Sequence, residues 1–279
     1  MEEIEGQNAI VVSLDEYRVF HPRMKQILRR LRKTPTIFNL LTLDFAYKLE
    51  EAVLEKAIQE GYNIIYEVSL NTPSALIERI ERAKGRGYET SLKAIATDDI
   101  TSILGAQQRY EAEIRKAKEK KMVIRGAKTF PRNKMLRSGI DLIRRLLRMP
   151  AVPRTDINYD FVVPRLVNRS YHNDAYRNML GTMDEVNPHI DYVQVYKRGR
   201  EKTDGPELIY SSKEAKSNFR SAREAVESVR QSERQRNYEA NRAKMISLRK
   251  GMILRGAKRA EFELLDEADR IFETEDRQR

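Results

Sequence analysis

The sequence of 279 residues contains no cysteine and no tryptophan. The absence of cysteine excludes disulfide bonds, thiol nucleophiles and cysteine-ligated zinc. No apolar run approaches the roughly 20 residues that a bilayer-spanning helix needs, and the polar, acidic start MEEIEGQ is not typical of a secretory signal. The three histidines show no metal-binding spacing, and no G-x-S-x-G motif indicates serine-hydrolase chemistry. We therefore expect a cytoplasmic protein with no membrane segment and no bound metal on histidine or cysteine.

What the sequence does contain is an excess of positive charge, with a formal net charge of +11. Residues 115–148 carry a net charge of +11 and residues 213–260 carry +9, whereas residues 261–279 reverse the sign to −5. Basic clusters favour polyanions such as nucleotides, nucleic acids or acidic partners. The alternative for 213–260 is a solvated face of a helix. The apolar fraction of 40% is sufficient for a buried core.

The first part of the chain alternates between strand-like and helix-like segments. Short β-branched runs predict parallel strands, and segments with a helical pattern separate them. Strands are predicted at 7–14, 62–68 and 88–96, and helices at about 36–60, 73–84 and 98–121. Such alternation is typical of an α/β fold with a parallel sheet flanked by helices, in which ligands bind beyond the carboxyl ends of the strands.

The second part of the chain is more basic and more helical. We expect a basic helix at 131–148, a break at the prolines of 149–154, a helix at 172–186, two strands within 193–212, and a long helix or helix pair over 213–275 that is interrupted near Gly251 and Gly256. This pattern predicts one α/β domain at 1–212 with a charged helical extension at 213–279.

Three carboxylates lie at or near predicted strand ends. Asp15 directly follows the first strand, where a carboxylate can accept the proton of an attacking hydroxyl, although an N-cap role is the alternative. Glu67 ends the second strand, and Glu51 lies on the preceding helix, where simple surface exposure is the alternative and also fits Glu50. These carboxylates could converge on a sugar-like substrate or a magnesium ion.

Arginines in the middle of the chain are candidates for binding phosphate. Arg109 lies within a predicted helix, and Arg125 and Lys128 lie in the segment that follows. A helix that brings arginines to a transferring phosphoryl group neutralises the charge of the transition state. The alternative is a surface helix with paired charges, such as Glu111 and Arg115.

Four separated fragments together resemble the zeta-toxin family of P-loop kinases from toxin–antitoxin systems. The fragments are VVSLDEYRVFHP at 11–22, KLEEAVLEKAIQEGYNIIYEVSL at 48–70, SILGAQQRYE at 102–111 and VQVYKRGREKTDGPELIYSS at 193–212. Members of this family use ATP and Mg²⁺ to phosphorylate the 3′-hydroxyl of UDP-N-acetylglucosamine, and an antitoxin is a possible partner. The resemblance implies that Asp15 is the general base. It also implies that substrate is bound by Glu51, Glu67, Ser69 and Asn71, and that Arg109, Arg125 and Lys128 face ATP.

One motif of the family is missing from the sequence: no G-x-x-x-x-G-K-[ST] loop occurs in the 279 residues. Only 14 residues precede Asp15, so the sequence begins downstream of the expected loop and its strand. That loop holds the nucleotide phosphates and magnesium, and we therefore expect no turnover from this polypeptide. The missing strand belongs between 62–68 and 88–96, so those strands either close up, receive another segment, or leave the sheet incomplete. Ser13, Val68, Ser69 and Asn71 also depart from the usual family residues.

Three functions remain open from the sequence. A longer reading frame with a phosphate loop would make the protein a kinase, and without one it would be a degenerate kinase that still binds ligands or partners. The third possibility is a basic nucleic-acid-binding protein. We rank this last, because the chain has no recognisable nucleic-acid module and no aromatic residues interleaved with its basic runs.

Overall fold

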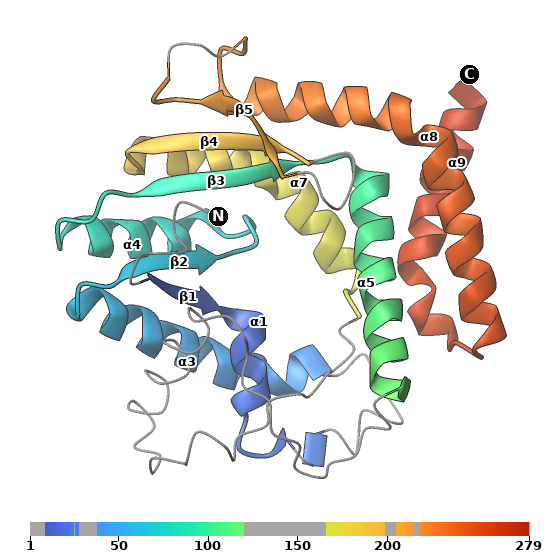
Figure 1. Cartoon of the computed structure of the whole chain (residues 1–279), viewed down its shortest axis with the longest axis horizontal. Helices are drawn as coiled ribbons and strands as arrows, with labels where there is room; N and C mark the ends of the chain where they lie inside the picture. The colour runs from blue at the N-terminus through green and yellow to red at the C-terminus, as the bar shows by residue number, and fades with distance from the viewer. Residues whose placement is uncertain are drawn as a thin grey trace. The chain divides into compact units, whose positions relative to one another are not determined.

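The computed structural model describes residues 9–24, 26–27, 38–119, 166–198, 205–214 and 218–278 (Figure 1). The chain forms two compact units, each built from two stretches of sequence. Unit 1 consists of residues 1–68 and 110–165, and unit 2 consists of residues 69–109 and 166–279. The predicted boundary at 212/213 falls inside unit 2, where the helix of residues 222–254 contacts all three strands of that unit's sheet.

Unit 1 is built on two parallel strands covered by one long helix. Strand β1 (Ala9–Ser13) pairs with β2 (Asn63–Glu67) from Ala9 opposite Asn63 to Ser13 opposite Glu67. Helix α3 (Phe38–Gln59) packs against both strands through a buried stripe that includes Ala46, Val53 and Ala57. Short helical turns follow β1, namely α1 (Leu14–Tyr17) and η2 (Arg18–Phe20). The left-handed backbone of Gly61, with φ at 71°, lets the chain turn from α3 into β2.

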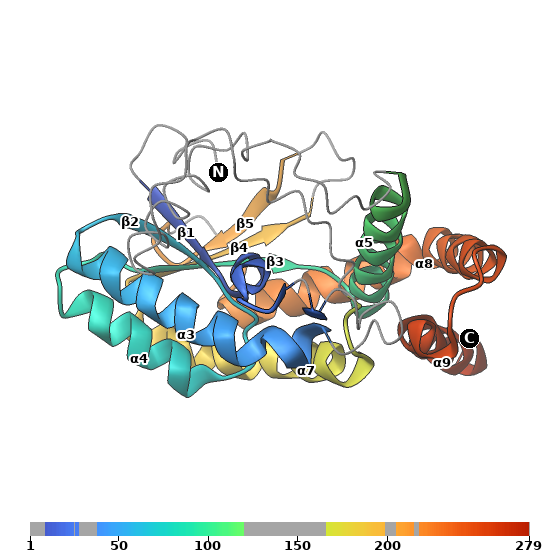
Figure 2. The same ribbon diagram turned by 90° about the horizontal axis from the view of Figure 1, so that it is seen from below.

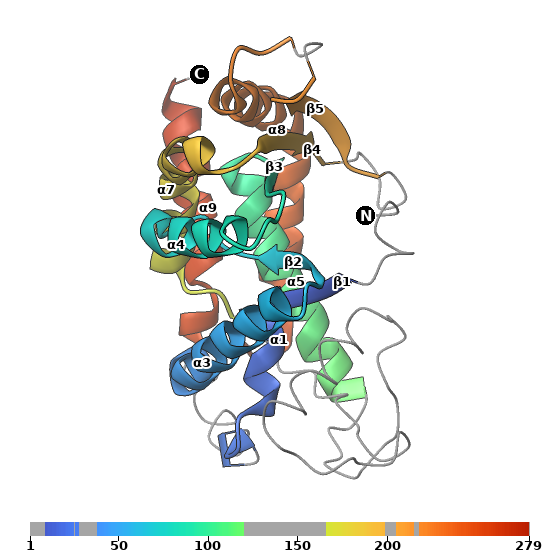
Figure 3. The same cartoon turned by 90° about the vertical axis from the view of Figure 1, so that its left-hand side faces the viewer.

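Unit 2 contains a mixed sheet of three strands. Strand β3 (Ser91–Ala96) runs parallel to β4 (Tyr192–Lys197), which pairs with β5 (Glu207–Ser211) in the antiparallel sense (Figure 3). Helix α4 (Pro73–Lys84) packs against α7 (Arg169–Val186) (Figure 2). The Asp191 carboxylate binds Lys84 and Thr90 and so ties the end of α4 to the start of the strands.

Three helices contribute to the core of unit 2, although residues 110–119 of the first of them belong to unit 1. Helix α5 (Asp99–Glu119) follows β3, and α8 (Ala222–Leu254) and α9 (Glu263–Gln278) form a C-terminal pair, with η5 (Arg259–Glu261) between them. The shared core contains residues of all three helices: Ile100, Ile103, Leu104, Tyr238, Met245, Met252, Leu264, Leu265, Ala268 and Phe272. The break predicted near Gly256 is confirmed by its φ of 72°, whereas the break near Gly251 is wrong. Gly251 lies inside α8, where a glycine costs only about 1 kcal/mol relative to alanine.

The strand pattern predicted for the N-terminal part is confirmed, as is the α/β class. Within the part of the chain that the structure describes, β2 pairs only with β1, and β3 pairs only with β4. The strands predicted at 62–68 and 88–96 therefore do not close up on each other. The predicted helix at 131–148 lies outside the described residues. None of the helices that could be searched combines the length and apolar character needed to cross a membrane.

Candidate functional site

The carboxyl ends of β1 and β2 bring two predicted site residues to one edge of unit 1. Because Ser13 and Glu67 are opposite each other in the ladder, Asp15 emerges only two residues beyond the position facing Glu67. Asp15 is about half exposed, with 54% of its side chain accessible, and Glu67 is also exposed. In parallel sheets this edge is where ligands bind. The structure therefore places both carboxylates where a substrate can reach them.

The Asp15 carboxylate is held by an arginine that sequence reasoning missed. The Nε atom of Arg18 donates a hydrogen bond of 3.0 Å to Oδ1 of Asp15. Arg18 itself is buried, and its Nη1 atom donates to the backbone carbonyl of Asn39 and to Oγ1 of Thr42, both at 3.0 Å. The N-cap alternative for Asp15 is wrong, because Ser13 occupies the N-cap position of α1. Asp15 is instead anchored to α3 through Arg18.

A buried tyrosine lies beneath this edge. Tyr17 is 3% exposed, and its hydroxyl donates to the carbonyl of Val11 at 3.2 Å. Burial raises the pKa of the Tyr17 phenol, and the nearby negative charges of Glu50 and Glu67 raise it further. Glu50 is 3% exposed, so the predicted surface position is wrong for this residue, while its neighbour Glu51 is half-buried. The negative charges of Glu50 on α3 and of Glu67 on β2 thus both act on the same phenol.

These carboxylates do not form a metal site of the usual kind. Among the residues that the structure describes, no group of three or more histidine, aspartate or glutamate side chains is placed to hold a metal ion. A joint magnesium site of Asp15, Glu51 and Glu67 is therefore not formed by these side chains alone. Their arrangement is better suited to accepting hydrogen bonds from substrate hydroxyl groups.

The predicted substrate residues Ser69 and Asn71 belong to unit 2 and contact helix α7. The hydroxyl groups of Ser69 and Tyr171 lie 2.6 Å apart, and Nδ2 of Asn178 donates to Oδ1 of Asn71 at 2.8 Å. Tyr171 remains 51% exposed. Sequence reasoning missed both partners, since they lie more than 100 residues from the groups that they bind. The only signal was their position in a segment predicted to be helical.

The predicted phosphate-binding residues are described only in part. Arg109 is exposed on α5. Arg125 and Lys128 lie outside the described residues. Arg109 is consequently the one member of this predicted set for which the structure gives a position.

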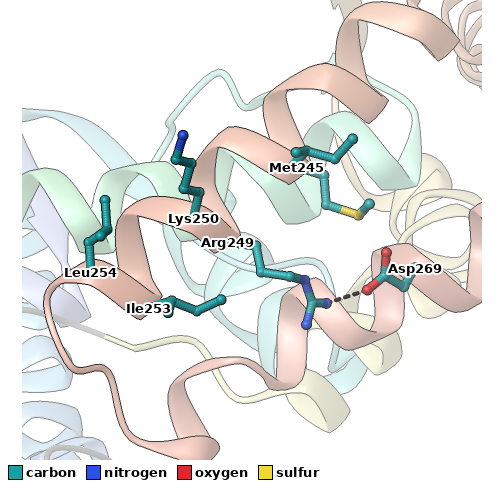
Figure 4. A pocket seen from close by; sticks show the side chains of 7 residues that line it. Met245, Arg249, Lys250, Ile253, Leu254 and Asp269 are labelled. Atoms are coloured by element: carbon teal, nitrogen blue, oxygen red, sulfur yellow. Dashed lines mark hydrogen bonds and ion pairs between the residues drawn. The ribbon is translucent and has the colours of Figure 1, made fainter.

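A hollow of about 460 Å³ lies between α8 and α9 in unit 2, and none of the predicted site residues lines it. Ile246, Ile253 and Leu254 give it an apolar wall, and the dashed line in Figure 4 marks the ion pair between Arg249 and Asp269 at its edge. The hollow contains no arrangement of acid, base or nucleophile. It is a surface feature of the helix pair and not a second candidate active site.

Comparison with known proteins gives matches that agree on one family. The family model described as Zeta toxin matches residues 1–134. The protein Toxin zeta of Streptococcus pyogenes is 28% identical over 110 residues, which are 39% of this chain and 37% of that protein. Toxin PezT of Streptococcus pneumoniae serotype 4 is 30% identical over 104 residues, or 37% of this chain and 40% of that protein. These matches therefore cover well under half of the curated relatives.

A solved structure has a similar fold over most of this chain. A chain from the structural characterisation of the PezAT chromosomal toxin–antitoxin system of Streptococcus pneumoniae aligns with a TM-score of 0.54 and 19% sequence identity. The alignment covers 88% of this chain and 78% of that one. At this identity the likeness shows the fold alone, and the shared fold is the P-loop-kinase type with a helical C-terminal part.

Proposed function

We propose that this chain, whose residues 1–134 match the Zeta toxin family model, is part of a kinase that transfers a phosphoryl group from ATP to the 3′-hydroxyl of UDP-N-acetylglucosamine. The observation that carries the proposal is the position of Asp15 and Glu67 at the paired ends of β1 and β2. This edge offers a fixed carboxylate for proton transfer beside a second carboxylate that can bind a sugar hydroxyl.

In the proposed mechanism Asp15 is the general base. Its carboxylate accepts the proton of the attacking hydroxyl while the oxygen forms its bond to phosphorus. The hydrogen bond from Arg18 fixes the orientation of the carboxylate, and the anchoring of Arg18 on α3 limits the movement of both groups. Glu67 and Glu51 accept hydrogen bonds from other substrate hydroxyl groups, and Ser69 and Asn71 add neutral polar contacts.

The binding of ATP and Mg²⁺ requires groups other than these carboxylates. Mg²⁺, when bound, neutralises the negative charge of the nucleotide phosphates during transfer. The described side chains offer it no site of three ligands, and the phosphates themselves are the ligands that it usually takes in kinases. Arg109 is proposed to contact those phosphates, as are Arg125 and Lys128. Since the 279 residues include no G-x-x-x-x-G-K-[ST] motif, this polypeptide by itself is expected to give no turnover.

Substrate binding tests the proposal without depending on turnover. We expect UDP-N-acetylglucosamine to bind the 279-residue chain in isothermal titration calorimetry, and Glu67→Gln to weaken binding about tenfold, since a hydrogen bond to a charged group contributes about 1.5–3 kcal/mol. Glu78→Gln, at an exposed position of α4, is the matched control and should bind like the wild type. Absence of binding, or equal effects of the two variants, would contradict the proposed substrate.

Turnover is tested with labelled ATP, magnesium and the same nucleotide sugar. The chain alone should form no product, and robust product would show that the phosphate loop is dispensable. A longer reading frame that supplies the loop should be active, and Asp15→Asn should abolish that activity without changing the thermal unfolding midpoint. Retained activity would exclude Asp15 as the base.

We also propose an antitoxin protein as a partner, because the similar structure belongs to a toxin–antitoxin system. The second candidate function is ligand binding without catalysis. Two contacts of α7 favour ligand binding without catalysis. Tyr171 and Asn178 already occupy the polar groups of Ser69 and Asn71, so a substrate must displace these hydrogen bonds to reach them. Binding of the nucleotide sugar by a longer, loop-containing protein that shows no turnover would select this candidate.

A further inference from the structure

A serine and a histidine from two helices of unit 2 are hydrogen-bonded to each other, away from the strand ends of unit 1. Ser102 lies in the first turn of α5 and His172 in the first turn of α7, and Oγ of Ser102 is 2.9 Å from Nε2 of His172. Both side chains are only half-buried, so a small reagent can reach them. A hydroxyl within hydrogen-bond reach of a histidine is the first requirement for a nucleophilic serine.

The hydrogen bonds on the other side of the imidazole ring fix its tautomer. The amide nitrogen Nδ2 of Asn173 donates to Oε1 of Glu267 at 3.0 Å, since an ionised carboxylate can only accept. Oδ1 of Asn173 therefore faces Nδ1 of His172, at 3.4 Å, and the ring hydrogen lies on Nδ1. Nε2 is then the acceptor for the hydroxyl hydrogen of Ser102, which is the arrangement that a general base needs.

Charge and ring stacking hold this chain of hydrogen bonds in place. Oε2 of Glu267 pairs with Arg270 at 3.3 Å and with Arg169 at 3.8 Å, so two cations fix the carboxylate at its end. The ring of His172 lies nearly parallel to that of Tyr176, with 9° between the planes and 6.2 Å between the centroids. These contacts limit rotation of the imidazole, as the third member of a serine–histidine triad does.

The ionisation of His172 also suits a base. Burial lowers the pKa of its imidazole, while the hydrogen bond to Asn173 and the negative charges of Asp99 and Glu267 raise it by less. The ring is therefore mostly neutral near pH 7, and Nε2 is free to take up a proton.

Two backbone donors beside Ser102 are already used. The N–H groups of Ile100 and Thr101 are bonded to the carboxylates of Asp99 and Asp98, so neither can stabilise an oxyanion that develops next to Ser102. Loss of one such donor slows acyl transfer roughly 10²–10³-fold in enzymes that depend on it. We therefore expect slow modification of Ser102 and not rapid hydrolysis.

We propose that Ser102, His172 and Asn173 form a nucleophilic site at which Ser102 takes up an acyl group from an activated ester. Oγ of Ser102 forms a bond to the carbonyl carbon while Nε2 of His172 accepts the hydroxyl proton. The ester oxygen leaves with the bonding electron pair and receives that proton from His172. Asn173 is a positioning residue. The sequence has no G-x-S-x-G motif, but such sites are defined by geometry and not by sequence order. The site is independent of the proposed kinase function.

Labelling of the full 279-residue chain with a fluorophosphonate tests the nucleophile. In this reaction Oγ bonds to phosphorus, fluoride leaves and His172 takes the proton. Peptide mass spectrometry should place the label on Ser102, and Ser102→Ala should remove it. Ser170→Ala is the matched control, because the hydroxyl of Ser170 on α7 donates to Asp174 at 3.3 Å. Equal labelling of Ser102 and Ser170, or no label on Ser102, would overturn the proposal.

Acetylation of Ser102 by an activated aryl acetate tests the base. His172→Gln should slow it about a hundredfold, which is the usual contribution of a general base. His189→Gln is the control, since His189 also lies in unit 2 but is bonded to Glu81 at 2.7 Å and not to a serine. Thermal unfolding midpoints check that both variants are folded. Equal rates for the wild type and His172→Gln would mean that the contact of Ser102 with His172 is only structural.

The pH profile of the wild type tests the base without any substitution. Asp99 on α5 and Glu267 on α9 are the charged groups that act on the ring of His172, and Tyr176 stacks on it from α7. Acetylation of Ser102 should be nearly independent of pH above about pH 7. It should slow as the imidazole is protonated below its usual pKa of about 6.5. A rate that instead keeps rising with hydroxide concentration would exclude His172 as the base and overturn the site.

Discussion

The arginines of α8 differ in their surroundings from two exposed arginines elsewhere in unit 2, namely Arg109 on α5 and Arg198 directly after β4. Along α8 and at its C-cap, six arginines have carboxylate partners: Arg223, Arg234, Arg236, Arg242, Arg249 and the C-cap residue Arg255. Arg109 and Arg198 have none among the described residues. A run of basic residues is therefore no evidence of a ligand where the protein itself supplies the counter-charge.

The counter-charge for α8 comes mainly from the last residues of the chain. The acidic segment 261–279 contains the partners of Arg234, Arg242, Arg249 and Arg255, on α9 or at η5. The reversal of charge between 213–260 and 261–279 is thereby explained as pairing within the molecule. The side chains of Arg234 and Arg242 remain 38% and 45% exposed, in line with the predicted solvated face, and polyanion binding by this segment stays a prediction.

The largest expected effect concerns the packing beneath these charges. Leu265→Ala should lower the free energy of unfolding by about 2–5 kcal/mol, because Leu265 is fully buried against α5 and α8. Leu254→Ala, at a leucine that is 79% exposed, is the control and should change it by less than about 0.5 kcal/mol. Urea unfolding followed by circular dichroism measures both. Similar effects of the two variants would mean that α9 is not part of the core of unit 2.

The variant Arg249→Gln tests how much an arginine with carboxylate partners contributes to stability. Arg249 bridges Asp266 and Asp269, so its loss leaves two neighbouring carboxylates without their cation. We expect a loss of about 1 kcal/mol in unfolding free energy, near the upper end for partly exposed ion pairs. The loss should shrink at about 1 M salt, where charges are screened beyond about 3 Å. A loss that is independent of salt would indicate packing of the side chain and not its charge.

A buried carboxylate on α8, Glu233, makes the stability of the fold depend on pH. Burial raises the pKa of Glu233, and the charge of the nearby Asp98 raises it further. A carboxyl group with a raised pKa in the folded state stabilises the fold below its unfolded pKa and loses this contribution as the pH rises through the folded value. Glu233→Gln should therefore increase the thermal unfolding midpoint near pH 7 relative to the wild type, with a smaller difference near pH 4. A lower unfolding midpoint of Glu233→Gln than of the wild type near pH 7 would show that the charge of Glu233 stabilises the fold.

The smallest expected effect is that of Arg198→Gln on stability. Since Arg198 has no carboxylate partner in the described part of the chain, its replacement should change the unfolding free energy by less than about 0.5 kcal/mol. The same urea titration that measures Arg249→Gln measures this variant. A loss as large as that of Arg249→Gln would show that the two arginines are structurally alike, and the comparison would fail.

The elements that the sequence predicted well are those specified by local patterns. The strands β1 and β2 contain short β-branched runs, β3 lies within the strand predicted at 88–96, and Gly61 and Gly256 mark turns that require a left-handed residue. The helix boundaries of α4 and α5 follow from Thr72-Pro73 and from Asp98, whose Oδ1 atom accepts the backbone N–H of Thr101. Each of these signals lies within a few residues of its effect.

The parts that escaped prediction depend on contacts between distant segments. The two units are each assembled from separate stretches, and no change of composition marks their boundaries. At the candidate site, the positions of Asp15 and Glu67 at strand ends were predictable. The support from Tyr171 was not, since it contacts Ser69 across 102 residues. The contact of Arg18 with Asp15 is local and could have been predicted, because the two residues are only three positions apart in the sequence.

The discontinuous core of unit 2 also bears on how the protein is made. Ile100 and Ile103 are synthesised early, yet Leu265 and Phe272, which cover them, emerge from the ribosome more than 150 residues later. Until then the apolar side of α5 is exposed, and such surfaces promote aggregation of nascent chains. This architecture predicts late, post-translational closure of the unit and a dependence on chaperones that an uninterrupted domain of the same size would not show.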